Sequence, residues 1–166
     1  GGGEVGVFDH YGERVADPDE PITHLSFYEA DAVARFLGAR LPTEAEWEHA
    51  AARSDVPEHG YNLRESRHYR ALPTEPSAER ELTQLYGDAW EWTQSAYAPY
   101  PGYRPARGAL GEYNGKFMAN QLVLRGGSCL TPRGHVRPTY RNFWYPDWEF
   151  QRTGGRLCRA PKEGDG

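Results

Sequence analysis

The sequence is poor in several residue types that mark secreted or metal-binding proteins. Its 166 residues include only two cysteines. Two cysteines cannot form the disulfide framework of a small secreted scaffold, and no Cys-x-x-Cys pair is present to hold zinc. The six histidines include no His-x-x-x-His pattern, so no complete metal site is visible within this chain. We expect Cys129 and Cys158 to be reduced thiols of a cytoplasmic protein.

Long apolar runs and blocks of basic residues are also missing. No stretch approaches the roughly 20 apolar residues that span a bilayer, and no signal peptide is visible. The net charge is −5, and the arginines are scattered among acidic residues, which argues against nucleic acid as a partner. We therefore expect a cytoplasmic location, with no membrane and no nucleic-acid partner.

Glycine, proline and aromatic residues are abundant instead. The chain has 19 glycines, 13 prolines and an aromatic content of 13%, which predicts many turns around an aromatic core. Its length suits one domain over 1–166. Because the sequence begins Gly1-Gly2-Gly3 rather than with Met, we expect a fragment of a longer protein.

Two short helices and a few strands are predicted. Residues 26–37 begin with a capping box, Ser-Phe-Tyr-Glu, and continue with apolar residues at helical spacing. A second capping box opens at Thr43. The acids of its first turn, Glu44, Glu46 and Glu48, suit the positive end of the helix dipole rather than a catalytic pair. Residues 1–25 suggest a hairpin, Trp90 and Trp92 alternate around Glu91 as in a strand, and 122–124 form another strand-like run.

An aromatic-rich segment stands out near the C-terminus. Six aromatic residues fall within eleven positions: Tyr140, Phe143, Trp144, Tyr145, Trp148 and Phe150. They could pack a core, since each ring buries a large apolar surface. They could also form a cage for a cationic ligand, since ring faces attract a quaternary ammonium by roughly 0.5–2 kcal/mol per contact.

Four motifs occur in a characteristic order: LPTEAEWE at 41–48, GDAWEW at 87–92, RGGS at 125–128 and a closing Gly-x-Arg-Leu at 154–157. In this order they resemble the formylglycine-generating-enzyme, or sulfatase-modifying-factor, family. The resemblance implies an α+β fold of the C-type-lectin-like kind, rich in loops, with two short capped helices and small antiparallel sheets. Gly126 and Gly127 fit a strand in close contact with another backbone.

Three further stretches give a narrower resemblance: SFYEADA at 26–32, GEYNGKFM at 111–118 and TPRGHVRPTYRNF at 131–143. They are similar to the sulfoxide synthases of ergothioneine biosynthesis. Those non-haem iron oxygenases use O2 to join a thiol to N,N,N-trimethylhistidine, and an N-terminal helical bundle carries the histidines that bind Fe(II). The resemblance implies that this chain is the substrate-binding half and that the iron-binding bundle is its partner.

The same resemblance assigns candidate site residues. The family contacts trimethylhistidine through positions that match Asn142, Phe143 and Trp144, and Tyr113 is the phenol nearest the position of a catalytic tyrosine in some branches. The neighbouring residues Arg141, Asp147 and Trp148 complete the candidate substrate-binding set. Branches that use glutamyl-cysteine have an Asp and an Arg where this chain has Trp144 and Trp148. The thiol could therefore be free cysteine, with glutamyl-cysteine left open.

Two other interpretations remain. A non-catalytic binding module, like the variable proteins of diversity-generating retroelements, would use the aromatic residues at 143–150 as a protein-binding surface. A formylglycine-generating oxidase would need two nearby cysteines after the Gly-Gly-Ser motif to bind copper, and only Cys129 lies there.

Overall fold

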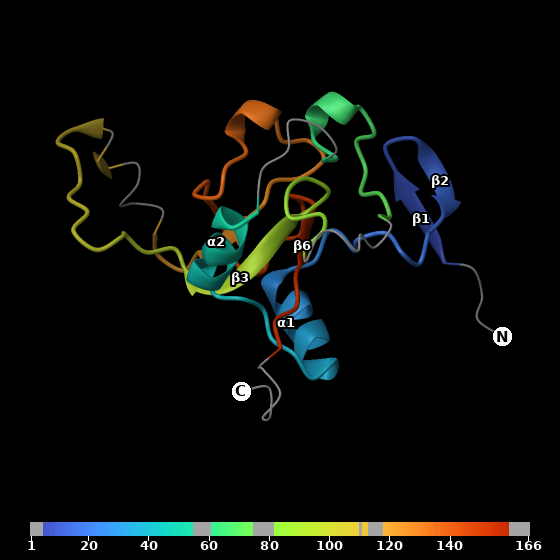
Figure 1. Ribbon diagram of the computed structural model, residues 1–166, viewed down its shortest axis with the longest axis horizontal. Helices are drawn as coiled ribbons and strands as arrows, with labels where there is room; N and C mark the ends of the chain where they lie inside the picture. The colour runs from blue at the N-terminus through green and yellow to red at the C-terminus, as the bar shows by residue number, and fades with distance from the viewer. Residues whose placement is uncertain (1–4, 55–60, 75–81, 110, 113–117, 160–166) are drawn as a thin grey trace.

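The computed structural model describes residues 5–54, 61–74, 82–109, 111–112 and 118–159. Its elements in chain order are β1 (Gly6–Asp9), β2 (Gly12–Val15), α1 (Phe27–Phe36), α2 (Glu44–Ala52), the 3-10 helix η1 (Arg64–Ser66), β3 (Trp90–Ala96), β4 (Leu122–Arg125), the 3-10 helix η2 (Arg133–His135), β5 (Asn142–Trp144) and β6 (Thr153–Gly155). They are short and joined by long irregular segments (Figure 1). The expected α+β class is confirmed.

Both expected helices form, and both begin at their capping boxes. In α1 the Ser26 hydroxyl accepts from the Glu29 N–H at 3.3 Å, while the Glu29 carboxylate accepts from the Ser26 N–H at 2.8 Å. In α2 the Thr43 hydroxyl plays the same part. Gly38, at φ +66°, follows α1 in the left-handed conformation that commonly ends a helix.

The central sheet has four strands in the order β5-β4-β3-β6. The β3–β4 and β4–β5 pairs are antiparallel, but β3 and β6 run parallel, so the expectation of wholly antiparallel sheets misses this pair. Strand β3 runs through the middle of the molecule (Figure 1). Leu124 lies opposite Trp92 on one side and Asn142 on the other.

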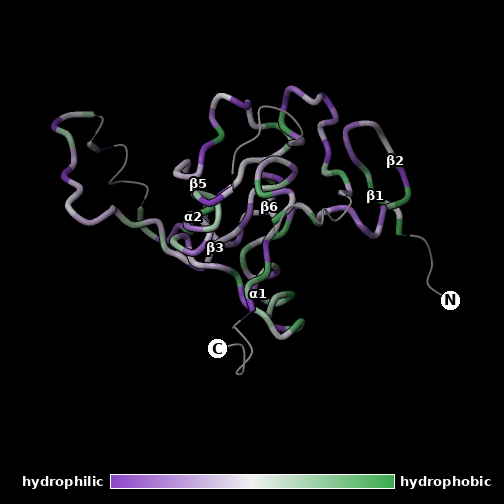
Figure 2. The backbone as a smooth tube through the Cα atoms, in the orientation of Figure 1, coloured by the Kyte–Doolittle hydropathy of each residue, from purple (hydrophilic) through white to green (hydrophobic). Residues whose placement is uncertain are grey.

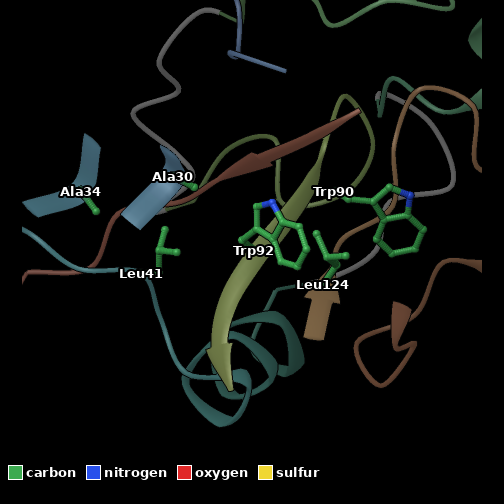
Figure 3. Packing of buried hydrophobic residues seen from close by; sticks show 6 residues of the cluster. All are labelled: Ala30, Ala34, Leu41, Trp90, Trp92 and Leu124. Carbon is green, nitrogen blue, oxygen red and sulfur yellow. The ribbon is translucent and has the colours of Figure 1, made fainter. Parts of the chain in front are cut away.

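The two faces of this sheet bury different cores. On one face Trp92 and Leu124 pack with three residues from α1 and the segment after it, namely Ala30, Ala34 and Leu41, and Trp90 lies at the opposite end of this cluster from Ala34 (Figure 3). On the other face α2 contributes Trp47 to a second cluster, and the Trp47 indole donates to Glu91 at 2.6 Å. This confirms the predicted alternation of β3, because Glu91 points away from Trp92.

The paired glycines lie where two backbones meet. A Cβ on Gly126 would lie 2.8 Å from the Leu85 carbonyl oxygen, and the Gly126 carbonyl accepts from the Gly87 N–H at 3.1 Å. The predicted close backbone contact is therefore confirmed.

The predicted N-terminal hairpin is also present, as β1 and β2. It stands apart from the four-stranded sheet and carries both polar and apolar segments (Figures 1 and 2). Phe8 on β1 is 84% exposed. Within the described part of the chain, no helix is both long and apolar enough to cross a membrane.

Candidate functional site

A cavity of about 390 Å³ and a larger one of about 610 Å³ open on the described surface. The larger one, called the Asn142 cavity here, lies where the start of β5, the loop after the Gly-Gly-Ser motif and the segment before β6 meet. Its lining residues are His24, Trp90, Ser128, Leu130, Thr131, Pro132, His135, Tyr140, Asn142, Phe150, Gln151 and Arg152. Its volume falls in the range of about 300–1,000 Å³ that small-molecule sites usually occupy.

Aromatic rings form part of the wall of the Asn142 cavity. The Trp90 and Tyr140 rings stack with centroids 6.0 Å apart and planes 27° apart. Phe150 is 58% exposed, whereas Trp90 is 7% exposed. Aromatic side chains therefore lie both at the buried end of the cavity and at its rim, and the Arg137 guanidinium already makes a cation–π contact with Tyr140, 5.2 Å from its ring centroid.

The charge of the two cavities differs. The smaller one is lined by four carboxylates, from Asp19, Glu20, Asp88 and Glu91, together with Arg156, and Arg156 is paired with Glu91 at 2.8 Å. The described residues that line the Asn142 cavity include no carboxylate. Among its described residues, only Arg152 carries a permanent charge.

Arg152 and His24 both have unusual backbones. Their φ angles are +51° and +63°, in the left-handed region that residues other than glycine seldom adopt. The Arg152 carbonyl accepts from the Trp90 N–H at 3.0 Å, and the Thr153 carbonyl accepts from the Leu25 N–H at 2.8 Å. These backbone bonds hold both strained residues at the wall of the cavity.

Of the candidate site residues that the structure describes, only Asn142 lines this cavity. Its amide group donates to the Gln151 side-chain oxygen at 3.5 Å, and its own oxygen accepts from the Phe143 N–H at 2.9 Å. The first contact is long, so the Asn142 amide N–H groups keep hydrogen-bonding capacity for a ligand.

Phe143 and Arg141 lie on the opposite face of β5 from Asn142, because side chains alternate along a strand. The Phe143 ring stacks on Tyr97 with centroids 4.0 Å apart. The Arg141 guanidinium lies 4.7 Å from the Tyr97 centroid and 4.5 Å from that of Tyr100. The structure therefore does not bring Phe143 and Asn142 to one cavity, and their joint role in substrate binding stays a prediction.

Arg141 belongs to a buried ion network on this face. It donates to both carboxylate oxygens of Glu44, at 2.6 and 2.9 Å. Arg125, whose side chain is fully buried, also donates to Glu44 at 2.7 Å and to Glu48. Glu44 is thus held by two arginines, which the helix-dipole interpretation of this residue did not anticipate.

Trp144 and Trp148 stack on each other with centroids 5.0 Å apart. Trp144 also packs against the core next to α1, whereas Trp148 is 36% exposed. Trp148 lies at the end of a turn closed by its N–H to the Tyr145 carbonyl at 3.1 Å, and Asp147 is exposed within that turn. Neither tryptophan nor Asp147 lines the Asn142 cavity, so these three assignments also stay predictions.

The remaining chemical candidates are the thiols and Tyr113. Cys129 and Cys158 are both free. Cys129 is buried, which raises the pKa of its thiol, while Cys158 exchanges backbone hydrogen bonds with Arg40. Among the described residues no group of three His, Cys, Asp or Glu side chains could hold a metal ion. Tyr113 lies outside the described residues.

The sequence interpretation missed most of the residues that line the cavity. Tyr140 and Phe150 belong to the aromatic-rich segment, so the aromatic pattern of the sequence already marks them as candidate binding residues. Trp90 was assigned to the core, and His135 has the pattern of an ordinary loop residue. Arg152 and His24 carry no local motif, because their unusual φ angles appear only in the folded chain.

Comparison with known proteins adds the family context. Residues 8–161 match the sulfatase-modifying factor enzyme 1-like domain. The chain is 36% identical over 161 residues to the hercynine oxygenase of Mycolicibacterium smegmatis. This alignment covers 84% of the chain and 37% of that protein. It is 31% identical over 141 residues to the formylglycine-generating enzyme of Streptomyces coelicolor, an alignment that covers 68% of the chain and 43% of that enzyme. The chain thus spans less than half the length of both relatives.

A solved structure supports the fold independently. The structure of PvdO from Pseudomonas aeruginosa matches with a TM-score of 0.62 and 18% identity, over 87% of this chain and 66% of PvdO. At that identity the match is evidence for the fold alone.

Proposed function

The chain belongs to the sulfatase-modifying factor enzyme 1-like family, and from that membership we propose that it is the substrate-binding half of an enzyme of the hercynine oxygenase type. Hercynine is N,N,N-trimethylhistidine, a betaine that carries a quaternary ammonium beside a carboxylate. In this proposal the Asn142 cavity binds that molecule. The observation that carries it is an open cavity with an aromatic wall and no carboxylate among its described lining residues, in a chain 36% identical to a hercynine oxygenase.

The chemistry of the wall supports a quaternary ammonium. Such a cation donates no hydrogen bonds, so aromatic faces and dispersion stabilise it better than polar groups do. Trp90, Tyr140 and Phe150 supply the faces, each worth roughly 0.5–2 kcal/mol when the contact is desolvated. Asn142 adds an amide that can hydrogen-bond a ring nitrogen of the imidazole and so fix its orientation.

The proposed reaction joins the sulfur of a thiol to a carbon of the imidazole, with O2 as oxidant. One oxygen atom ends in the sulfoxide, and the other leaves as water with the hydrogens removed from sulfur and carbon. The described residues do not fit an iron site, and we place the iron ligands on a helical bundle of the complete protein, as the family resemblance implies. The contribution of this chain is to bind the betaine and hold its ring in one orientation, which can contribute several kcal/mol.

The thiol substrate remains part of the proposal. Where glutamyl-cysteine branches have charged residues, this chain has Trp144 stacked on Trp148. An apolar pair offers no partner for a second carboxylate, which favours free cysteine over glutamyl-cysteine.

A calorimetric titration with hercynine tests the binding step. We expect wild type to bind, and Phe150→Ala to weaken binding by about 2- to 30-fold, the value of one cation–π contact. Phe8→Ala is a matched control, because Phe8 is 84% exposed on the distant hairpin. Failure of wild type to bind, or equal affinities for the two variants, would contradict the proposal.

Two observations bear on the alternatives. The exposed rings of Tyr145, Trp148 and Phe150 would also suit a protein-binding surface, since aromatic residues are enriched at interfaces. In that case hercynine would not bind, while relatives would differ mainly at these positions. A copper oxidase is less well supported, because of the two cysteines only Cys129 follows the Gly-Gly-Ser motif and its thiol is buried.

A further inference from the structure

We propose that Arg152 is the carboxylate-binding residue of the Asn142 cavity, where its guanidinium takes the α-carboxylate of an amino-acid ligand. This inference rests on the proposed function, in that it divides the same cavity into an aromatic part for the ammonium and a cationic part for the carboxylate. Arg152 is not among the residues that the family resemblance assigns.

The Arg152 guanidinium has no hydrogen-bond or ion-pair partner among the described residues. Three arginines next to the sheet are instead paired with carboxylates: Arg125 and Arg141 with Glu44, and Arg156 with Glu91. Arg152 is half-buried, yet no hydrogen bond or ion pair joins its side chain to the described part of the protein. A partly desolvated cation without a counter-charge favours an anion from solution.

The backbone of Arg152 is strained. A residue other than glycine at φ +51° carries a strain of about 1 kcal/mol or more. Glycine would relieve that strain, so the local backbone does not explain an arginine at this position. The neighbouring His24, at φ +63°, lines the same cavity. Strained residues that gather at one cavity are typical of binding sites.

A carboxylate is chemically complementary to the Arg152 guanidinium. A guanidinium presents two parallel N–H groups that match the two oxygens of a carboxylate. In an amino-acid betaine the carboxylate and the ammonium are attached to the same carbon, so one cavity must satisfy both. The Asn142 cavity contains Arg152 and the rings of Trp90, Tyr140 and Phe150, and no carboxylate among its described lining residues competes for the guanidinium.

The test compares ligands with and without the carboxylate. Calorimetry would measure the binding of hercynine and of its decarboxylated analogue, N,N,N-trimethylhistamine, to wild type, Arg152→Gln and Arg152→Gly. We expect Arg152→Gln to weaken hercynine binding about tenfold or more, and to leave the binding of the analogue unchanged. Arg35→Gln is the charge-matched control, because the Arg35 side chain is 76% exposed on α1.

Arg152→Gly separates binding from structure. It should keep or slightly raise the melting temperature, since it relieves the strained φ, while it loses as much hercynine affinity as Arg152→Gln. A merely structural arginine would show the reverse, with lower stability and unchanged affinity, and that result would overturn the inference.

The carboxylate that Arg152 binds could instead belong to the thiol substrate. Measuring the binding of cysteine to the hercynine complex tests this alternative. If Arg152→Gln leaves hercynine binding intact but abolishes cysteine binding to the hercynine complex, Arg152 still binds a carboxylate, that of the thiol. If neither ligand loses affinity, Arg152 is not a carboxylate site, although the proposed function stands. If wild type binds neither hercynine nor the analogue, the proposed function fails, and this inference fails with it.

Discussion

Two groups of arginines differ in their counter-charges. Those on the α2 side of the central sheet are paired with carboxylates, whereas Arg152 in the Asn142 cavity has no such pair in the described part of the chain. Arg125 and Arg141 are held by carboxylates from α2, with stacking from Tyr97 and Tyr100 on Arg141. Arg152 lines a cavity in which the structure describes no carboxylate. These arginines can therefore be sorted by their partners: Arg125 and Arg141 stabilise the fold, and Arg152, which has no carboxylate partner among the described residues, is available to a ligand.

The paired side also explains how the sheet is joined to α2. Glu44 lies 81 residues from Arg125 and 97 from Arg141, so the network connects β4, β5 and α2 across the sequence. Arg125 also donates to the Pro138 carbonyl at 2.6 Å. The network therefore fixes the segment that leads into β5 and, with it, the position of Asn142.

The largest expected effect comes from breaking this network at its centre. Arg125→Met leaves the carboxylate of Glu48 and the Pro138 carbonyl without their buried donor. Removing one partner of a buried ion pair typically costs about 3–5 kcal/mol of unfolding free energy. Urea denaturation should show this loss. A cost below about 1 kcal/mol would mean that the network is not buried in solution.

Arg141→Gln gives an intermediate effect and sharpens the contrast with Arg152. It removes a bidentate pair with Glu44, which we expect to lower the unfolding free energy by about 1–3 kcal/mol. Hercynine affinity should change less than about twofold, because Arg141 lies on the opposite face of β5. Denaturation and calorimetry on the same sample provide both values. A large loss of affinity without loss of stability would restore Arg141 as a substrate-binding residue.

Trp148→Ala, in the exposed aromatic cluster of Tyr145, Trp148 and Phe150, should have a smaller effect on stability. Its ring contacts Trp144, Tyr145 and Phe150 at centroid distances of 5.0 to 5.3 Å, so the loss of stability should be about 1 kcal/mol. Hercynine binding should hardly change, because Trp148 does not line the Asn142 cavity. If Trp148→Ala bound hercynine more weakly than Phe150→Ala does, the binding site would lie at the exposed aromatic cluster and not in the Asn142 cavity.

The smallest effect is a pH dependence of the helix α2 cap. The hydrogen bond from Arg40 lowers the pKa of Glu46 from its usual 4.5 to about 2. Since the pKa is lower in the folded state, the stabilisation is complete above about pH 4.5 and is lost as the pH falls toward 2. The side chain is 42% exposed, so the effect should stay below about 1 kcal/mol. The difference in stability between wild type and Glu46→Gln should therefore disappear in acid, and a constant difference would contradict this.

Local patterns predicted the local structure well. The capping boxes placed both helices, and the alternation around Glu91 placed the faces of β3, because these signals depend on residues three or two positions apart. The parallel pairing of β3 with β6 depends on residues far apart in sequence, and so does the network around Glu44. Asn142, which the family motifs assign to substrate binding, lines a cavity, but the motifs do not reveal the pleat of β5 that turns Phe143 away from it.

The central claim is that the Asn142 cavity holds a betaine between an aromatic wall and Arg152. The most direct measurement is a crystal structure of the 166-residue chain grown with hercynine. The account predicts the trimethylammonium against Trp90, Tyr140 and Phe150, with the carboxylate on Arg152. Hercynine bound instead beside Phe143 and Tyr97, or an empty Asn142 cavity at saturating hercynine, would contradict it.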